Sequence, residues 1–183
     1  MPVIICLLRG VNVGGNNKIK MEVLRALCES LDLEKPQTYI QSGNVVFKTK
    51  ERNLKSLARK IEDAIEGKVG FRPNVLLRTA SEVKETIAKN PFAKRRDLEP
   101  GKLLINFLAA DPAPGAYEEI VKINAGPEEV KIAGRELYIY FPDGMGRSKF
   151  PWPRVGKILG STSTGRNLNT VIKLLEMAGS FEG

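Results

Sequence analysis

Strand-like and helix-like apolar patterns alternate along residues 1–79 in the order β-α-β-β-α-β. Val3–Leu8 is a continuous apolar run of the kind that forms a buried strand. Apolar residues recur at helical spacing from Ile19 to Leu31 and again from Leu54 to Ile65. Shorter strands are predicted at Thr38–Gln41, Val45–Lys48 and Val75–Leu77. This order is that of the split βαβ, or ferredoxin-like, unit.

The second half has a similar order, β-α-β-β-α, and begins with the capping-box pattern Thr79-Ala80-Ser81-Glu82. Two alternating segments flank Gly134-Arg135, which predicts a hairpin. The other predicted elements are a strand at 103–109, a weak helix ending near Ile120, a helix after Pro151 and Pro153, and a terminal helix over 168–178. We therefore predict an α+β protein with a tandem of two ferredoxin-like units and mainly antiparallel sheets. The first would cover 1–79, and the second, with a linking helix and the C-terminal helix, 80–183.

The composition removes several kinds of chemistry. The chain has no histidine, so Ser-His-Asp and Cys-His catalysis and histidine-ligated zinc are excluded. Its two cysteines, Cys6 and Cys28, lie in apolar patterns and are expected to be core residues, so no metal or cofactor is predicted. The formal net charge of +8 favours anionic partners, although a soluble basic surface explains it equally well.

The apolar runs are too short to cross a bilayer, and Arg9 interrupts the first of them. No basic segment precedes that run, as it would in a secretory signal. We expect a cytoplasmic protein that does not contact membranes. The sequence leaves the oligomeric state open.

Topology predicts a candidate site at one end of the first sheet. In a split βαβ unit, the loop after strand one and the hairpin after strand two lie at the same end. Lys68–Arg72 should reach that end too. Glycines with nearby cations can present backbone N–H groups to an anion. The candidate anion-binding residues are therefore Arg9, Gly10, Asn12, Gly14, Gly15, Lys18, Ser42, Gly43 and Asn44.

This loop matches neither known phosphate motif. A P-loop would place Lys-Ser/Thr after the last glycine, where Asn16 and Asn17 stand, and Asn12 replaces the second glycine of the dinucleotide pattern. The alternative is an ordinary strand-to-helix turn in which asparagines accept positive φ. Arg166 and Asn167 form a second candidate anion site, with Asn167 as a simple helix cap as the alternative.

Four segments resemble a bacterial family catalogued as domain of unknown function 1697. They are Leu7-Leu8-Arg9-Gly10-Val11-Asn12-Val13-Gly14-Gly15, Lys20-Met21, Tyr39-Ile40-Gln41-Ser42-Gly43-Asn44-Val45-Val46-Phe47 and Thr164-Gly165-Arg166-Asn167-Leu168-Asn169-Thr170-Val171. The resemblance implies a tandem of ferredoxin-like units and no established activity. The chain departs from the family pattern at Gly165, at Leu168 and at Pro151-Trp152-Pro153.

Three functions remain open. The first is a non-enzymatic binder of a phosphate-bearing small molecule or a nucleic-acid backbone. Base stacking would need exposed aromatic residues on the sheets, and Tyr138 and Tyr140 are the only candidates there, with burial as the alternative. The second is a histidine-independent enzyme that acts on a small anionic substrate. The third is a homo-oligomeric interaction module that uses exposed sheet edges.

Overall fold

The computed structural model describes residues 1–183, which form two compact units. The first unit contains Met1–Glu85 together with Lys173–Gly183, and the second contains Thr86–Ile172. The last residues of the chain thus make their contacts in the first unit. A domain boundary after residue 79 stays a prediction.

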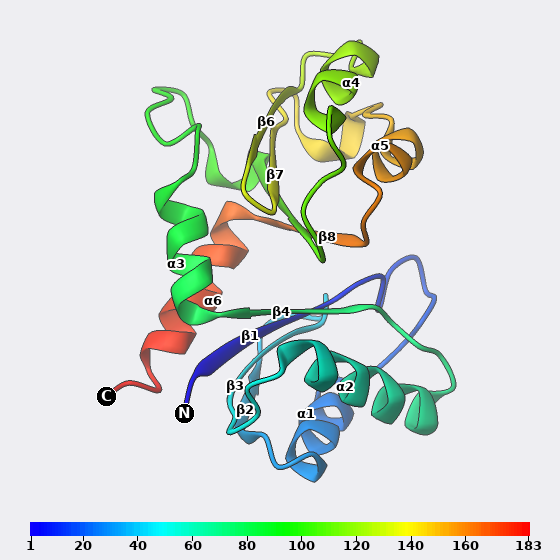
Figure 1. Cartoon of the computed structure of the whole chain (residues 1–183), viewed down its shortest axis with the longest axis vertical. Coiled ribbons are helices and arrows are strands. Elements are labelled where there is room, and N and C mark those ends of the chain that lie inside the picture. Colours follow the sequence, from blue (N-terminus) through cyan, green and yellow to red (C-terminus); the bar gives the residue numbers. More distant parts are fainter. The chain divides into compact units, whose positions relative to one another are not determined.

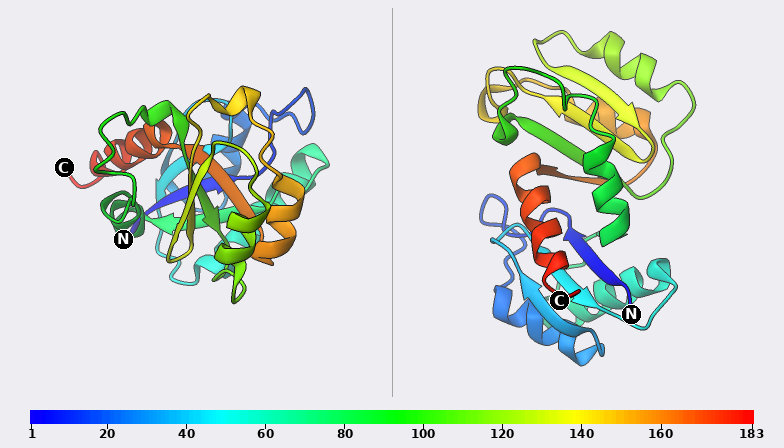
Figure 2. Two further views of the ribbon diagram at one scale, coloured as in Figure 1. Left: turned by 90° about the horizontal axis from the view of Figure 1, so that it is seen from above. Right: turned by 90° about the vertical axis from the view of Figure 1, so that its left-hand side faces the viewer.

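The first unit is built on a four-stranded sheet with the order β2-β3-β1-β4, in which all neighbouring strands are antiparallel. Its strands are β1 (Val3–Leu8), β2 (Glu34–Thr38), β3 (Asn44–Lys48) and β4 (Val75–Thr79). Helices α1 (Met21–Ser30) and α2 (Leu54–Val69) lie side by side on one face of this sheet (Figures 1 and 2). The core between them contains the alternate residues Ile4, Cys6 and Leu8 of β1.

The second unit repeats this plan, with the strand order β6-β7-β5-β8 and antiparallel neighbours. Its strands are β5 (Leu103–Leu108), β6 (Glu129–Ala133), β7 (Glu136–Tyr140) and β8 (Ser163–Asn167), and its helices α4 (Ala116–Ile123) and α5 (Trp152–Leu159) cover one face (Figure 1). The remaining helices are α3 (Ala80–Ala88) and α6 (Leu168–Gly179), with short 3₁₀ turns at Pro100–Lys102 and Met145–Arg147. The predicted tandem of ferredoxin-like units is confirmed.

One strand was predicted at the wrong residues and one was not predicted, and both are edge strands. The second strand is Glu34–Thr38 rather than Thr38–Gln41, and it contains Pro36, which only an edge strand tolerates. The final strand β8 was missed because Ser163–Asn167 lacks an alternating apolar pattern. Its backbone pairs with β5, where Gly165 passes close to Leu104.

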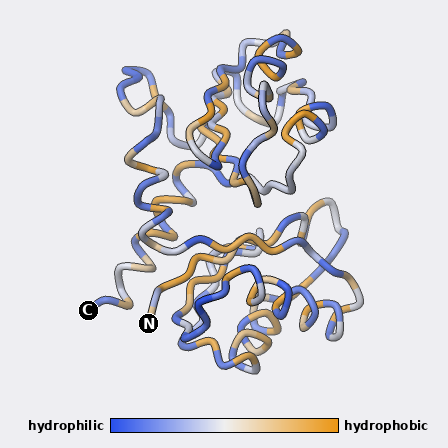
Figure 3. Tube along the Cα trace, in the orientation of Figure 1, coloured by the Kyte–Doolittle hydropathy of each residue, from blue (hydrophilic) through white to orange (hydrophobic).

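Local sequence signals define several other elements. Thr79 and Glu82 form the predicted capping box: each backbone N–H donates to the other's side chain, at 2.7 and 3.1 Å. The central strands of both sheets are rich in apolar residues (Figure 3). Cys6 and Cys28 are buried and form no disulfide bond. No helix has the length and apolar character needed to cross a membrane.

Candidate functional site

Three segments of the first unit meet where β1 ends. The backbone N–H of Leu8 donates to the carbonyl of Gly43 at 2.8 Å, and that of Arg9 donates to the carbonyl of Asn74 at 2.9 Å. The loop after β1, the β2–β3 hairpin and the segment before β4 are thereby joined. We call this end of the sheet the rim, and define it as residues 9–19, 41–44 and 74.

The side chain of Asn12 holds the rim together. Its Nδ2 donates to the carbonyls of Gln41 at 2.7 Å and Ile19 at 3.0 Å, while its Oδ1 accepts the N–H of Ile19 at 2.9 Å. Asn12 also has φ of 54°, a left-handed conformation that asparagine tolerates better than most residues. These bonds occupy both its donor and its acceptor group, so Asn12 acts as a clamp between loop, helix start and hairpin.

Gly14 and Gly15 form the tip of the loop after β1. They have φ of 57° and 77°, and the flanking residues Val13 and Asn16 form an isolated antiparallel bridge. Two successive positive φ values in a two-residue connection are typical of a type I′ hairpin turn. Both glycines are exposed, and a Cβ at either position would have no neighbour within 4 Å.

The hairpin residues Ser42, Gly43 and Asn44 are tightly packed. Asn44 is fully buried, and its Nδ2 donates to the carbonyl of Tyr39 at 3.0 Å and to the Ser42 hydroxyl at 2.9 Å. Gly43 has φ of 80°, and a Cβ there would lie 2.6 Å from Cγ2 of Val11. Only glycine fits this position, so these residues shape the hairpin.

The cations of the rim are free. Arg9 and Lys18 are exposed, and neither side chain has a hydrogen-bond or ion-pair partner. Arg72, which was expected to join them, instead forms ion pairs with Glu62 and Asp63 of α2. The rim thus combines a hydrogen-bonded frame with two unpaired positive charges.

The second candidate segment belongs to the second unit. Asn167 caps α6, because its Oδ1 accepts the N–H of Thr170 at 2.9 Å. Arg166 is buried, and its Nη1 donates to the Thr164 hydroxyl and to the Gly165 carbonyl, both at 2.8 Å. Each of these contacts serves the local structure of β8 and the start of α6.

The two tyrosines of β7 are not a stacking platform, because Tyr138 is 0% exposed and Tyr140 is 2% exposed. Burial, followed by the nearby charge of Glu136, raises the pKa of Tyr138, whose hydroxyl donates to the Thr86 carbonyl at 2.7 Å. The exposed large aromatic residue is Trp152, 39% exposed at the start of α5. Sequence reasoning noted it only as a departure from the family pattern.

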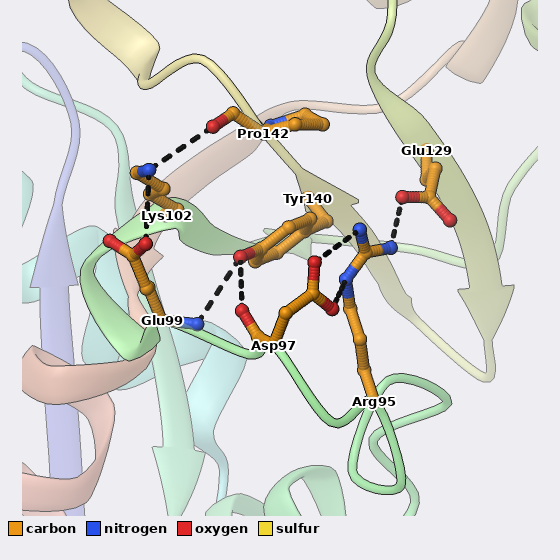
Figure 4. A network of polar contacts seen from close by, with 7 residues as sticks. All are labelled: Arg95, Asp97, Glu99, Lys102, Glu129, Tyr140 and Pro142. Atoms are coloured by element: carbon orange, nitrogen blue, oxygen red, sulfur yellow. Dashed lines mark hydrogen bonds and ion pairs between the residues drawn. The ribbon is translucent and has the colours of Figure 1, made fainter.

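Tyr140 instead anchors the segment before β5 (Figure 4). Its hydroxyl donates to the Asp97 carbonyl at 3.0 Å and accepts the N–H of Glu99 at 3.2 Å. The Arg95 guanidinium lies 4.2 Å from the ring centroid and pairs with Asp97 and Glu129. The Arg95 guanidinium thus links two carboxylates and holds the loop in place. No group of three or more His, Cys, Asp or Glu side chains could hold a metal ion.

Comparison with known proteins supports the fold and leaves activity open. A solved structure described as that of conserved bacterial protein SP0830 from Streptococcus pneumoniae matches with a TM-score of 0.68 and 24% identity, covering 97% of this chain and 98% of the other. No curated protein matches. The family described as "Protein of unknown function (DUF1697)" matches residues 1–138, about three quarters of the chain. The chain belongs to this family.

Proposed function

We propose that the chain is a non-enzymatic binder of a phosphate-bearing partner, a nucleotide or a nucleic-acid backbone, and that the rim is its site. The observation that carries this proposal is that different residues of the rim define its shape and supply its positive charge. Asn12, Gly43 and Asn44 define its shape, whereas Arg9 and Lys18 extend from it without a partner. The protein would act in the cytoplasm, and the absence of a disulfide between Cys6 and Cys28 agrees with a reducing compartment.

A fixed frame with free charges suits anion binding. Because the frame is already hydrogen-bonded, a ligand would order only the Arg9 and Lys18 side chains on binding. Gly14 and Gly15 leave the surface of the loop tip open, so a phosphate can approach the backbone. The net charge of +8 adds a long-range attraction for anions.

A thermal-shift screen with nucleotides, phosphorylated metabolites and short DNA and RNA tests the proposal. A ligand at one hundred times its Kd stabilises the folded chain by about 2.7 kcal/mol and raises Tm. Arg9→Ala and Lys18→Ala should abolish that rise and leave the unliganded Tm near that of the wild type, because neither side chain has a partner.

Lys55→Ala is the matched control, since Lys55 is an exposed cation on α2 near the other end of the sheet. The control should keep the full ligand response. Absence of any Tm rise across the screen, or equal loss in Lys55→Ala, would contradict a site at the rim.

A further inference from the structure

A cluster of unpaired cations lies on the helical face of the second unit. It is formed by five exposed residues: Lys122, Arg147, Lys149, Arg154 and Lys157. None of them has an ion-pair or hydrogen-bond partner, in contrast to Arg95 and Lys102 of the same unit, which pair with carboxylates. The sequence from Gly144 to Leu175 contains no Asp or Glu.

These cations border two hollows that share Ile123. One, of about 350 Å³, lies between the end of α4 and the loop 143–151 and is lined by Arg147 and Lys149. The other, of about 270 Å³, lies between α4 and α5, with Ile123 and Ile158 among its apolar residues. Because they share a residue, the hollows form one surface. We call it the α4–α5 surface, and it includes the loop 143–151.

Few negative charges oppose these cations. The exposed carboxylates that line the hollows are Asp143 and Glu119. The third carboxylate, Glu128, is buried and accepts a hydrogen bond from the Ser148 hydroxyl. The surface is therefore net positive, and its charge is available to a partner.

Trp152 adds an aromatic group at the start of α5, the helix that also carries Arg154 and Lys157. Its ring packs edge-to-face on Phe150, with centroids 4.9 Å apart, and Phe150 is itself buried. Trp152 nevertheless keeps 39% of its surface exposed. The buried Phe150 ring thus supports the exposed Trp152 ring. In the sequence, Trp152 stands between the cations Lys149 and Arg154.

We propose that the α4–α5 surface binds single-stranded nucleic acid, with Trp152 stacked on a base and Arg147, Lys149, Arg154 and Lys157 contacting phosphates. Single strands are bound in this way because bases stack on aromatic rings while a positive groove follows the backbone. An acidic peptide would match the charge but would leave the exposed indole without a stacking partner. This proposal concerns a different unit from the rim and does not depend on it.

The test measures binding of a labelled 12-nucleotide DNA and the equivalent RNA to the full chain at about 50 mM salt. Arg154→Gln with Lys157→Gln should weaken binding about tenfold or more and reduce the salt slope by about 1 to 2 units. Lys50→Gln with Lys55→Gln changes the net charge equally but lies in the first unit, and should weaken binding less than twofold.

Stacking of a base on Trp152 can be measured separately, by tryptophan fluorescence. The chain has one tryptophan, so its tryptophan emission comes from Trp152 and should be quenched at saturation with oligonucleotide. Trp152→Ala should weaken binding about 5- to 150-fold, the range for one stacked base, while Trp152→Phe should keep most of the affinity. The Tm of each variant shows whether it remains folded, and the two charge variants do not touch the Phe150 contact.

Four results would overturn the proposal. The first is that neither oligonucleotide binds, and the second is that the two double charge variants lose affinity equally. The third is that a duplex or polyglutamate binds as tightly as the single strand. The fourth is that Arg9→Ala, rather than the variants of the α4–α5 surface, weakens binding of the oligonucleotide. The last result would place nucleic acid at the rim instead. Tighter binding of the DNA or of the RNA oligonucleotide would show which of the two nucleic acids the surface prefers.

Discussion

The two units share a strand order but elaborate opposite ends of their own sheets. In the first unit the long connection is residues 9–20, after β1, whereas the matching connection of the second unit is the shorter 109–115. The second unit instead lengthens the connection from β7 to α5, residues 141–151, whose counterpart is only 49–53. The core of this fold therefore leaves either end free to carry a larger loop.

The two long loops also differ in how they are held. The loop of the first unit is held by Asn12 and by a hairpin in which glycine is required at Gly43. The loop of the second unit is anchored by buried Phe150 and by the bond between Ser148 and Glu128. Its charged side chains, Asp143, Arg147 and Lys149, are exposed. Substitutions in the loop of the first unit should therefore lower the free energy of unfolding. Substitutions in the loop of the second unit should mainly change the charge of the exposed surface.

The largest expected effect comes from comparing two single glycine substitutions, one in each unit. Gly43→Ala combines a positive φ with a contact of 2.6 Å to Val11, so we expect a loss of about 3 kcal/mol in the free energy of unfolding. Gly144 has a similar φ of 84° but no neighbour within 4 Å, and Gly144→Ala should cost about 1 kcal/mol. Urea unfolding measures both, and equal losses would refute the contrast.

A second comparison uses two asparagines. Asn12→Ala removes three hydrogen bonds and should cost about 2 kcal/mol, within the range for polar groups left unsatisfied. Asn124 of the second unit makes a bond of 2.6 Å to the Glu128 carbonyl and a weaker one of 3.3 Å from the Gly126 N–H. Asn124→Ala should cost about 1 kcal/mol. A larger loss for Asn124→Ala in the same urea assay would mean that the α4–β6 connection of the second unit, residues 124–128, is held more tightly than the loop after β1.

Alkaline pH should act on the first unit, which contains both cysteines. Burial, with a smaller contribution from Glu29, raises the pKa of Cys28 from 9.0 to about 12. Because the folded pKa is raised, the neutral thiol stabilises the fold fully below pH 9, and this stability is lost as the pH rises toward 12. Unfolding measured from pH 8 to 11 should show a steeper loss for the wild type than for Cys28→Ala, and parallel curves would contradict the burial argument.

The smallest effect is expected in acid. The hydrogen bond from Arg95 is the largest cause that lowers the pKa of Asp97. Because the pKa of Asp97 is lowered in the folded chain, its bond with Arg95 stabilises the fold above the ordinary aspartate pKa near 4. This stabilisation is lost as the pH falls through the pKa of Asp97 in the folded chain. The amide of Glu99, which is bonded to Tyr140, should then lose protection from hydrogen exchange. Asp97→Asn should show that lower protection already at neutral pH, and an unchanged wild-type protection at pH 3 would argue against the linkage.

Periodicity and topology were enough to predict the central strands, the helices and the meeting of the rim loops. They failed at β2 and β8, where main-chain pairing at a sheet edge forms a strand from residues without an apolar pattern. Residue type could not show that Asn12 would be a clamp, because that role depends on a φ of 54° and on carbonyls distant in sequence. The exposure of Trp152 likewise depends on how Phe150 packs beneath it.

The turn at Gly14-Gly15 makes the first unit a natural scaffold for grafting. The frame that fixes the loop closes below the tip, through the bonds from Asn12 to Ile19 and from the Asn12 N–H to the Asn17 carbonyl. Residues inserted between the glycines would leave those bonds in place, and each doubling of loop length costs only about 0.6 kcal/mol in closure entropy. Foreign peptides can therefore be displayed there while the sheet beneath keeps its register.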